Sequence, residues 1–199
     1  MAGDCFLGLD LGQRVDYTAM ALVTPVVEAD GAVDYLRFLQ PTVERLRVVR
    51  LERLPLGTRY REVVRRVREV TSLPEFAGCE VVADATGVGM PVVEMLQDAG
   101  LKASIVPVTI TSGGSARRDG GVWHVPRRDL LGKLVVEFEQ GRLRLPGRSA
   151  LAGRLREEIA GVQAGSGRGG GHDDLVFALA LAVWRAGRGG RPREHGRLF

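Results

Sequence analysis

The pattern of apolar and polar residues predicts a chain that alternates between short strands and helices. Apolar, often β-branched runs predict strands over residues 5–11, 18–26, 33–39, 46–51, 81–84 and 103–110, with shorter extended pieces at 122–125 and 142–145. Apolar residues at helical spacing predict helices over residues 58–71, 91–100, 127–140, 149–159 and 173–184. This order is typical of a mixed α/β domain.

Residues near the ends of these elements refine the picture. Thr58 is suited to cap the first helix, and Gly100 is suited to end the second. The helix from residue 173 is apolar nearly all round, so we expect it to lie inside the core. Gly-rich stretches predict loops at 112–121 and 163–171. We expect one domain over residues 1–186 and a disordered Arg/Gly-rich tail over residues 187–199.

Composition narrows the class of protein. At 199 residues the chain has the size of one ordinary domain and can bury a core. No apolar run approaches the roughly 18 residues that a membrane helix needs, and the N-terminus shows no export signal, so we expect no membrane segment. Cys5 and Cys79 lie in apparent strands without a cluster of Cys or His. That setting predicts reduced thiols in the core and a cytoplasmic protein.

The charge is moderately basic and is concentrated at the C-terminal end. The net charge is +4 at pH 7, and lysine occurs only at Lys102 and Lys133. After residue 184 the chain has one acidic residue, Glu194, and five arginines. The arginines are Arg185, Arg188, Arg191, Arg193 and Arg197. The tail is either a solvated terminus or an arm that contacts nucleic acid without regard to sequence.

Acidic residues at three places suggest chemistry. Asp10 lies in an apolar run, Asp84 ends another, and Asp173 and Asp174 open the apolar last helix. A carboxylate among buried apolar residues is costly unless a cation compensates it, and hard divalent cations prefer oxygen ligands. If the fold gathers these groups, they form a site for metal-assisted phosphoryl chemistry.

Each of these positions also has a structural interpretation. Asp10 or Asp84 could serve a turn, and the acidic pair could cap the last helix. Since adjacent helical residues point about 100° apart, we expect one of Asp173 and Asp174 to cap and the other to bind metal. Carboxylates elsewhere in the chain are expected to be solvated surface charges, among them Asp119, Asp129, Glu137, Glu139, Glu157 and Glu158.

The chemistry itself favours a pair of cations. Phosphodiester cleavage needs an activated water, in-line geometry and stabilisation of the leaving oxygen, which two divalent ions about 3.5–4 Å apart can supply. Mg²⁺ or Mn²⁺ would suit such a set of carboxylates, because Mg²⁺ keeps several waters and needs few protein ligands. A histidine base is not required, so His172 is either a proton shuttle or a loop residue without a role.

Three motifs occur in a telling order: Gly8-Leu9-Asp10-Leu11-Gly12, Ala83-Asp84-Ala85-Thr86-Gly87-Val88-Gly89, and His172-Asp173-Asp174-Leu175-Val176-Phe177-Ala178-Leu179-Ala180. Together they resemble the ribonuclease H-like superfamily and, within it, the nuclease domain of the terminase large subunit of tailed phages. The resemblance covers residues 5–186. It implies a mixed central sheet, with the first three strands antiparallel and the later ones parallel, flanked by helices.

The resemblance also implies roles for the acidic residues. Asp10 matches the first-strand carboxylate that bridges two metal ions, and Asp84 matches the second ligand. The third ligand sits at the pair Asp173–Asp174, where Asp174 is preferred. Asp16 matches an additional acidic position of some terminase nucleases. The chain departs from many relatives at Phe177, where they carry another acidic residue.

As a function, the resemblance implies an Mg²⁺- or Mn²⁺-dependent endonuclease that cuts concatemeric viral DNA during genome packaging. It would act on double-stranded DNA in the cytoplasm of a bacterial host, alongside a terminase ATPase motor, a portal or a small terminase subunit. The chain has no Gly-x-x-x-x-Gly-Lys-Ser/Thr loop, so we expect the motor to be absent from it. Arg117, Arg118 and Arg168 are candidate contacts to the DNA backbone, or simply exposed loop charges.

Other functions remain open at this point. A Holliday-junction resolvase would share the core and the carboxylates, and a DNA-binding or assembly module could keep a vestigial metal site. The run Gly8-Leu9-Asp10-Leu11-Gly12 also resembles the first phosphate-binding segment of actin-like and sugar-kinase ATPases. Those proteins need two such domains, for which 199 residues leave no room.

Overall fold

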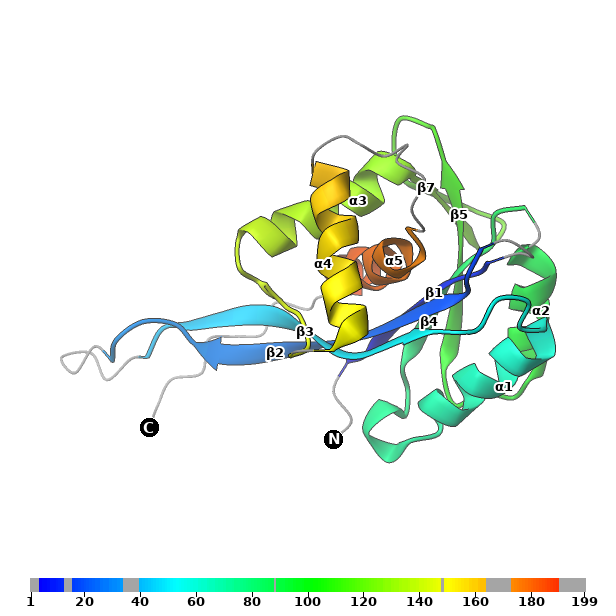
Figure 1. Ribbon diagram of the computed structural model, residues 1–199, viewed down its shortest axis with the longest axis horizontal. Coiled ribbons are helices and arrows are strands. Elements are labelled where there is room, and N and C mark those ends of the chain that lie inside the picture. The colour runs from blue at the N-terminus through cyan, green and yellow to red at the C-terminus, as the bar shows by residue number, and fades with distance from the viewer. Residues whose placement is uncertain are drawn as a thin grey trace.

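A single mixed sheet organises the protein in the computed structural model, which describes residues 4–12, 16–33, 40–87, 89–147, 149–163 and 173–189 (Figure 1). Within these residues the sheet has eight strands in the order β6-β7-β5-β4-β1-β2-β3-β8. The strands are β1 (Phe6–Asp10), β2 (Ala19–Ala29), β3 (Thr42–Arg53), β4 (Glu80–Asp84), β5 (Ser104–Thr111), β6 (Arg117–Asp119), β7 (Val122–Pro126) and β8 (Leu143–Arg144). The helices are α1 (Tyr60–Thr71), α2 (Gly89–Asp98), α3 (Arg127–Glu139), α4 (Ala150–Gln163) and α5 (Asp174–Gly189), with a short 3₁₀ turn at Pro74–Phe76.

The strand directions are those expected of a ribonuclease H-like fold. β1, β2 and β3 are antiparallel neighbours, whereas β4 pairs parallel with β1, β5 with β4, and β7 with β5. The sheet is therefore antiparallel over its first three strands and parallel from β1 through β4 and β5 to β7, with β6 added antiparallel at the edge. This mixed sheet confirms the predicted fold class.

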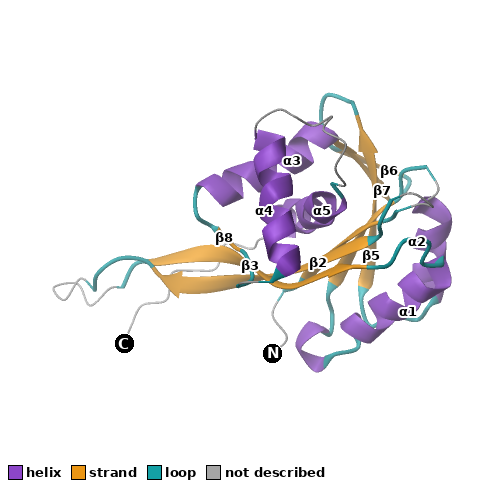
Figure 2. Ribbon diagram, in the orientation of Figure 1, coloured by secondary structure: helices purple, strands orange, loops and turns teal. Residues whose placement is uncertain are grey.

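Helices cover both faces of this sheet and form two apolar cores. α3, α4 and α5 lie on one face and α1 and α2 on the other (Figures 1 and 2). Because side chains alternate along a strand, Phe6 of β1 joins the core under α5, while Leu7 and Leu9 join the core under α1 and α2. α5 is buried almost throughout, as its apolar composition predicts.

α5 approaches β1 unusually closely at Gly8. A Cβ atom added to Gly8 would lie 1.8 Å from the carbonyl oxygen of Ala178 and 2.9 Å from the amide nitrogen of Ala182. No side chain fits in that space, so the glycine allows the backbones of strand and helix to meet. This contact sets the depth at which the helix start lies over the sheet.

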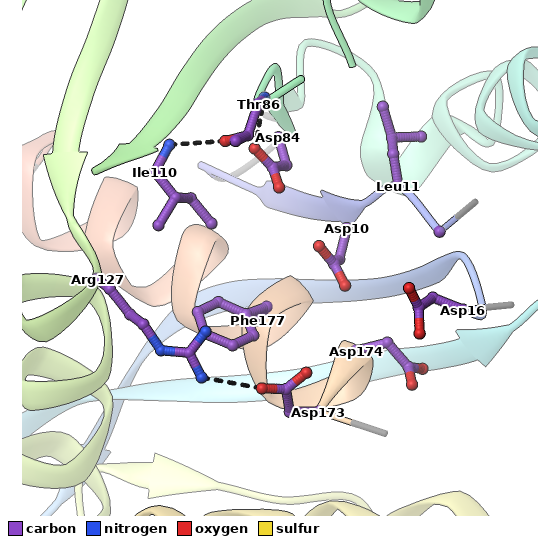
Figure 3. A pocket seen from close by; sticks show the side chains of 11 residues that line it. Asp10, Leu11, Asp16, Asp84, Thr86, Ile110, Arg127, Asp173, Asp174 and Phe177 are labelled. Carbon is purple, nitrogen blue, oxygen red and sulfur yellow. Dashed lines mark hydrogen bonds and ion pairs between the residues drawn. The ribbon is translucent and has the colours of Figure 1, made fainter. Parts of the chain in front are cut away.

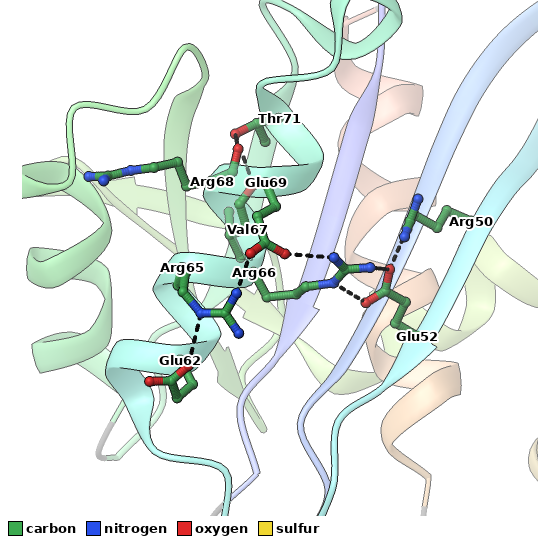
Figure 4. A network of polar contacts seen from close by, with 9 residues as sticks. All are labelled: Arg50, Glu52, Glu62, Arg65, Arg66, Val67, Arg68, Glu69 and Thr71. Carbon is green, nitrogen blue, oxygen red and sulfur yellow. Dashed lines mark hydrogen bonds and ion pairs between the residues drawn. The ribbon is translucent and has the colours of Figure 1, made fainter.

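β2 and β3 form a long hairpin that extends beyond the body of the molecule (Figure 1). Both strands are longer than predicted, since β2 continues to Ala29 and β3 spans Thr42–Arg53. Of the strand expected over residues 33–39, only Val33 is described, and it is not in a strand; the others lie outside the described residues. At the other end of β3, Glu52 accepts hydrogen bonds from Arg50 and, at 2.7 Å, from Arg66 of α1, which ties this helix to the sheet (Figure 4).

Two local expectations were wrong. Thr58 does not cap α1: its hydroxyl donates to the carbonyl oxygen of Pro55 at 2.6 Å, and the helix begins at Tyr60 without a side-chain cap. Residues 117–119 form the edge strand β6, paired antiparallel with β7, where we expected only loop. A positive-φ turn at Gly120 and Gly121 closes this small hairpin.

The two cysteines also correct an expectation. Cys5 and Cys79 are buried as predicted, but they form a disulfide instead of remaining reduced. They directly precede β1 and β4, which are parallel neighbours in the register Phe6↔Glu80. This places their Cα atoms 4.7 Å apart across 74 residues of sequence. Linear spacing gives no sign of such a pairing.

The C-terminal end differs from the predicted boundary. α5 continues to Gly189, past the expected helix end at residue 184 and into the expected tail. Residues 190–199 lie outside the described residues. Over the part of the chain that is described, no helix is long and apolar enough to cross a membrane.

Candidate active site

A pocket of ≈ 530 Å³ opens where β1 and β4 end and α5 begins (Figure 3). Its described lining residues are Asp10, Leu11, Gly12, Asp16, Asp84, Thr86, Ile110, Arg127, Asp173, Asp174 and Phe177. All five aspartates singled out from the sequence are among them. Carboxylates from distant parts of the chain thus share one cavity.

The alternation of side chains explains why Asp10 and Asp84 meet. β1 and β4 run parallel in the register Leu9↔Ala83, and each aspartate is the next residue of its strand. Val82 of β4 lies in the core under α5, and Gly8 of β1 contacts α5, so residues two positions further on face the same side. Both carboxylates therefore point toward the start of α5.

Asp10 is the most strongly perturbed carboxylate of the pocket. Burial raises the pKa of Asp10 well above its usual range, and the negative charges of Asp84, Asp174, Asp173 and Asp16 raise it further. The described lining of the pocket holds five aspartates and one basic residue, Arg127, so negative charge predominates there.

Asp84 forms the turn that was its structural interpretation, and its carboxylate also lines the pocket. Its Oδ1 accepts a hydrogen bond from the amide of Thr86 at 2.8 Å, as in an Asx turn. The Thr86 hydroxyl in turn accepts from the amide of Ile110 on β5 at 2.9 Å. Burial raises the pKa of Asp84, while the contacts with Thr86 lower it. The turn fixes the carboxylate without neutralising it.

The two aspartates at the start of α5 have different environments. Asp174 is buried and lies against Arg53 of β3, whose Nε and Nη2 donate to its two carboxylate oxygens at 2.7 and 3.0 Å. Asp173 has a side chain that is 55% exposed and pairs with Arg127 at 2.9 Å. The carbonyl oxygen of Asp173 accepts from the amide of Phe177, so its backbone begins the helix.

Glu158 of α4 completes the cluster around Arg53 and corrects another expectation. It accepts from Arg53 Nη2 at 2.7 Å and from the amide of Val176 at 3.0 Å, with a side chain that is only 12% exposed. Burial raises the pKa of Glu158 to about 7, with Asp174 adding to the shift and Arg53 opposing it. Glu158 is thus part of the framework of the site and not a surface charge.

Of the other carboxylates expected to be solvated surface charges, one is buried and several are exposed. Glu137 is buried between Lys133 at 2.6 Å and Arg142 at 2.8 Å, so it is not a solvated charge either. Asp119, Glu139 and Glu157 are exposed, as predicted.

The predicted phosphate-contacting arginines do not lie in the pocket. Arg117 and Arg118 belong to the edge strand β6, where the Arg118 guanidinium lies 5.9 Å from the ring of Trp123. Neither residue lines the pocket. Arg168 and His172 lie outside the described residues.

Sequence reasoning missed Arg53 and Arg127. Arg53 follows a stretch of alternating charged and apolar residues that resembles any exposed strand. Arg127 follows Pro126 at a predicted helix start. Its place at the junction of a predicted strand and a predicted helix was the one signal that could have pointed to it.

A divalent cation fits the chemistry of this donor set. Carboxylates accept and do not donate, and Mg²⁺ and Mn²⁺ prefer oxygen ligands. In their present positions, no three acidic, His or Cys side chains among the described residues are grouped to hold one ion. The side chains surround the pocket instead of converging on one point. Asp10 and Asp84, with Asp173 or Asp174, are the groups that a bound cation would draw together.

Comparison with known proteins finds two similar sequences. No family model matches the chain. It is 25% identical over 181 residues to the terminase large subunit of Thermus virus P23-45, and 26% identical over 182 residues to that of Thermus phage G20c. The chain is similar to terminase large subunits over most of its length. The resemblance predicted from the motifs is confirmed, with 88% of this chain matched in each case.

The chain spans much less than the length of these large subunits. The matched region corresponds to 30% of the length of each large subunit. Among solved structures, RuvC of T. thermophilus in complex with a Holliday junction substrate covers 92% of this chain at 15% identity, with a TM-score of 0.42. The fold assignment rests on the strand order and directions described above.

Proposed function

We propose that this terminase relative is a metal-dependent endonuclease that hydrolyses phosphodiester bonds of double-stranded DNA. The observation that carries the proposal is the convergence of five aspartates from β1, β4, the β1–β2 connection and the start of α5 on one pocket. Their mutual repulsion raises the pKa of Asp10, in addition to the effect of burial. A site that concentrates carboxylates in this way is suited to binding divalent cations and, through them, phosphate.

Asp10, Asp84 and one of the α5 aspartates are the proposed ligands of two Mg²⁺ or Mn²⁺ ions. When bound, such a pair activates water and stabilises the charge that develops on the attacking and leaving oxygens. The protein supplies orientation. The Thr86 turn holds Asp84, Arg53 holds Asp174, and the exposed carboxylates of Asp16 and Asp173 leave room for an ion to recruit them.

The relatives extend the proposal to a biological setting. As a terminase nuclease, the protein would cut concatemeric viral DNA during genome packaging in the host cytoplasm. An ATPase motor, a portal and a small terminase subunit would be its partners. Contacts to DNA would involve the backbone and not particular bases. The candidate contacts are Arg117 and Arg118 of the edge strand β6 and the arginines after residue 190, whose guanidinium groups suit phosphate.

A nicking assay tests the proposal. Supercoiled plasmid is incubated with the protein in Mg²⁺, in Mn²⁺ and in chelator, and we expect nicking only with a divalent cation. Asp10→Asn and Asp84→Asn should abolish it, because each removes a charged ligand. Asp119→Asn is the matched control, since Asp119 is exposed and lies outside the pocket.

Two results would contradict the proposal. One is nicking that persists in chelator or in the Asp10→Asn and Asp84→Asn variants. The other is a protein that binds duplex DNA without cutting it under any metal condition, which would indicate a DNA-binding or assembly module. A labelled four-way junction in the same assay distinguishes a resolvase, which would cut the junction in preference to linear duplex.

A further inference from the structure

Arg127 differs from every other residue that lines the pocket. Among the described lining residues it is the single basic side chain, facing five aspartates. It is the first residue of α3, directly after the buried end of β7 at Pro126. Its backbone is therefore fixed by the junction of a strand with a helix, while its side chain remains 49% exposed and accessible from the pocket.

The guanidinium of Arg127 rests on an aromatic side chain. Its Cζ atom lies 4.2 Å from the centre of the Phe177 ring, within the range of a cation–π contact (Figure 3). Phe177 is itself 4% exposed, so the ring is held by the core. Stacking covers one face of the guanidinium plane and leaves the N–H groups along its edge able to donate.

The present partner of that edge is easily exchanged. Arg127 Nη2 donates to Asp173 Oδ2 at 2.9 Å, but the two side chains are 49% and 55% exposed. Exposed ion pairs contribute little to stability, so an incoming anion can replace the carboxylate at small cost. Phe177 and the end of β7 would keep the guanidinium in place during this exchange.

We propose that Arg127, held by Phe177, is the residue of the pocket that binds a phosphate group of the nucleic-acid backbone. This inference rests on the proposed nuclease function and assigns the substrate contact that the aspartates cannot make. A phosphodiester is repelled by an acidic pocket, and a planar guanidinium offers it two parallel N–H donors. Phe177 acts as a positioning residue.

Released from Arg127, the Asp173 carboxylate is able to turn toward the other acids. Its side chain is exposed and comes from the same helix start as Asp174, whose two oxygens are already engaged by Arg53. Binding of backbone phosphate and recruitment of Asp173 as a ligand are therefore two results of one exchange. Asp173 would then be the α5 aspartate that is free to join Asp10 and Asp84 around a cation.

The first test is binding, which does not depend on cleavage. Affinity for a fluorescent duplex of about 20 base pairs is measured in Ca²⁺ across a salt series. Arg127→Ala should weaken binding about tenfold and reduce the slope of log affinity against log salt by about 0.9, the value for one neutralised phosphate. Arg128→Ala is the matched control. The side chain of Arg128 is next in sequence, is 71% exposed, pairs with Asp129 and lies outside the pocket. Equal losses in the two variants would overturn the assignment.

The second test is cleavage. Under single-turnover conditions Arg127→Ala should cut duplex DNA about 100-fold more slowly, as when one charge-stabilising donor is removed, and Arg127→Lys should recover only part of the rate. Phe177→Leu should slow the wild-type protein severalfold but have no further effect in the Arg127→Ala background, since the ring acts through the guanidinium.

A wild-type protein that cuts DNA while Arg127→Ala cuts equally fast would refute this inference alone. A wild-type protein that never cuts would refute the proposed nuclease, and the binding test would still decide the role of Arg127.

Discussion

At the scale of single residues, the two aspartates at the start of α5 show how neighbouring positions can acquire different chemistry. Asp174 is buried and held by Arg53 through both oxygens, whereas Asp173 is half exposed and held by one bond. The sequence presents them as equivalent. The difference in their environments comes from β3 and α4. These elements bring Arg53 and Glu158 to Asp174.

The cluster of Arg53, Asp174 and Glu158 should be critical for stability. Arg53→Ala leaves two buried carboxylates without their cation, and breaking a buried ion pair in this way costs about 3–5 kcal/mol. Arg53→Lys should recover only part of this, because lysine cannot donate to both oxygens in the same plane. Urea unfolding measures the loss. Arg47→Ala, at a side chain that is 53% exposed, is the control and should unfold close to wild type.

The raised carboxyl pKa values predict an unusual pH dependence in chelator. Burial raises the pKa of Glu158 to about 7, and those of Asp10 and Asp84 are also raised. The folded state then holds protons that the unfolded chain has already released, so stability falls as pH rises from about 4.5 to 7.

Melting temperatures across this pH range test the point. Glu158→Gln should flatten the fall, and added Mg²⁺ or Mn²⁺ should reduce it by compensating the aspartates. Below about pH 4.5 the opposite trend should appear, because arginine partners lower the pKa of Glu52 and Glu69, so these groups lose stabilising contacts on protonation. Stability that increases steadily from about pH 5 to 7 would show that the carboxyl groups with raised pKa values do not control the pH dependence.

At the scale of elements, most of the fold was predictable because the pattern of apolar residues is strong. The apolar strands β1 and β4 and the start of the largely apolar α5 were located to within a few residues. The edge of the sheet was less predictable. β6 is a three-residue strand of charged side chains, Arg117–Asp119, which no propensity distinguishes from a loop.

Arg53 was unpredictable for a geometric reason. Val23 pairs with Val48 but Leu22 pairs with Arg50, so Val49 is an extra residue in β3. Such a bulge shifts the alternation of side chains by one position. Leu46 and Val48 face α5 before it, and Leu51 faces α5 after it. Arg53, two residues further on, therefore reaches the site, whereas an unbroken alternation would direct it to the opposite face.

The contact between β1 and α5 provides a test at the same scale. Gly8→Ala places a methyl group within 1.8 Å of the Ala178 carbonyl oxygen, so helix and strand must separate. We expect a loss of about 3 kcal/mol or more, at the upper end for an overpacked core. Gly132→Ala in the middle of α3 meets nothing within 4 Å and should gain about 0.5–1 kcal/mol instead. Chemical denaturation of both variants compares them directly. A Gly8→Ala protein as stable as wild type would mean that the two elements are not in close contact.

At the scale of the whole molecule, charge is divided by location. The pocket is acidic, while the net charge of the chain is +4 and its C-terminal residues carry several arginines. Long-range attraction to DNA and the chemistry at the pocket therefore depend on separate groups. The fold that gathers the aspartates was foreseeable from three motifs, but the partners that neutralise or orient them come from distant segments and required the structure.

This separation predicts how DNA is held. Removing residues 190–199, which keeps α5 complete, deletes Arg191, Arg193 and Arg197. If these arginines neutralise backbone phosphates, affinity should fall and the slope of log affinity against log salt should decrease by up to about 2.7, at about 0.9 for each phosphate. The wild-type protein should bind several unrelated duplexes equally, because phosphate contacts carry no base information. At saturating protein, the single-turnover cutting rate of the truncated chain should be unchanged, since no pocket residue is altered.

Replacing the three arginines with glutamine in the full chain separates charge from length and should reproduce the effect of the deletion. A strong preference for one sequence, or an affinity that stays constant from low to high salt, would show instead that the protein recognises DNA through its bases.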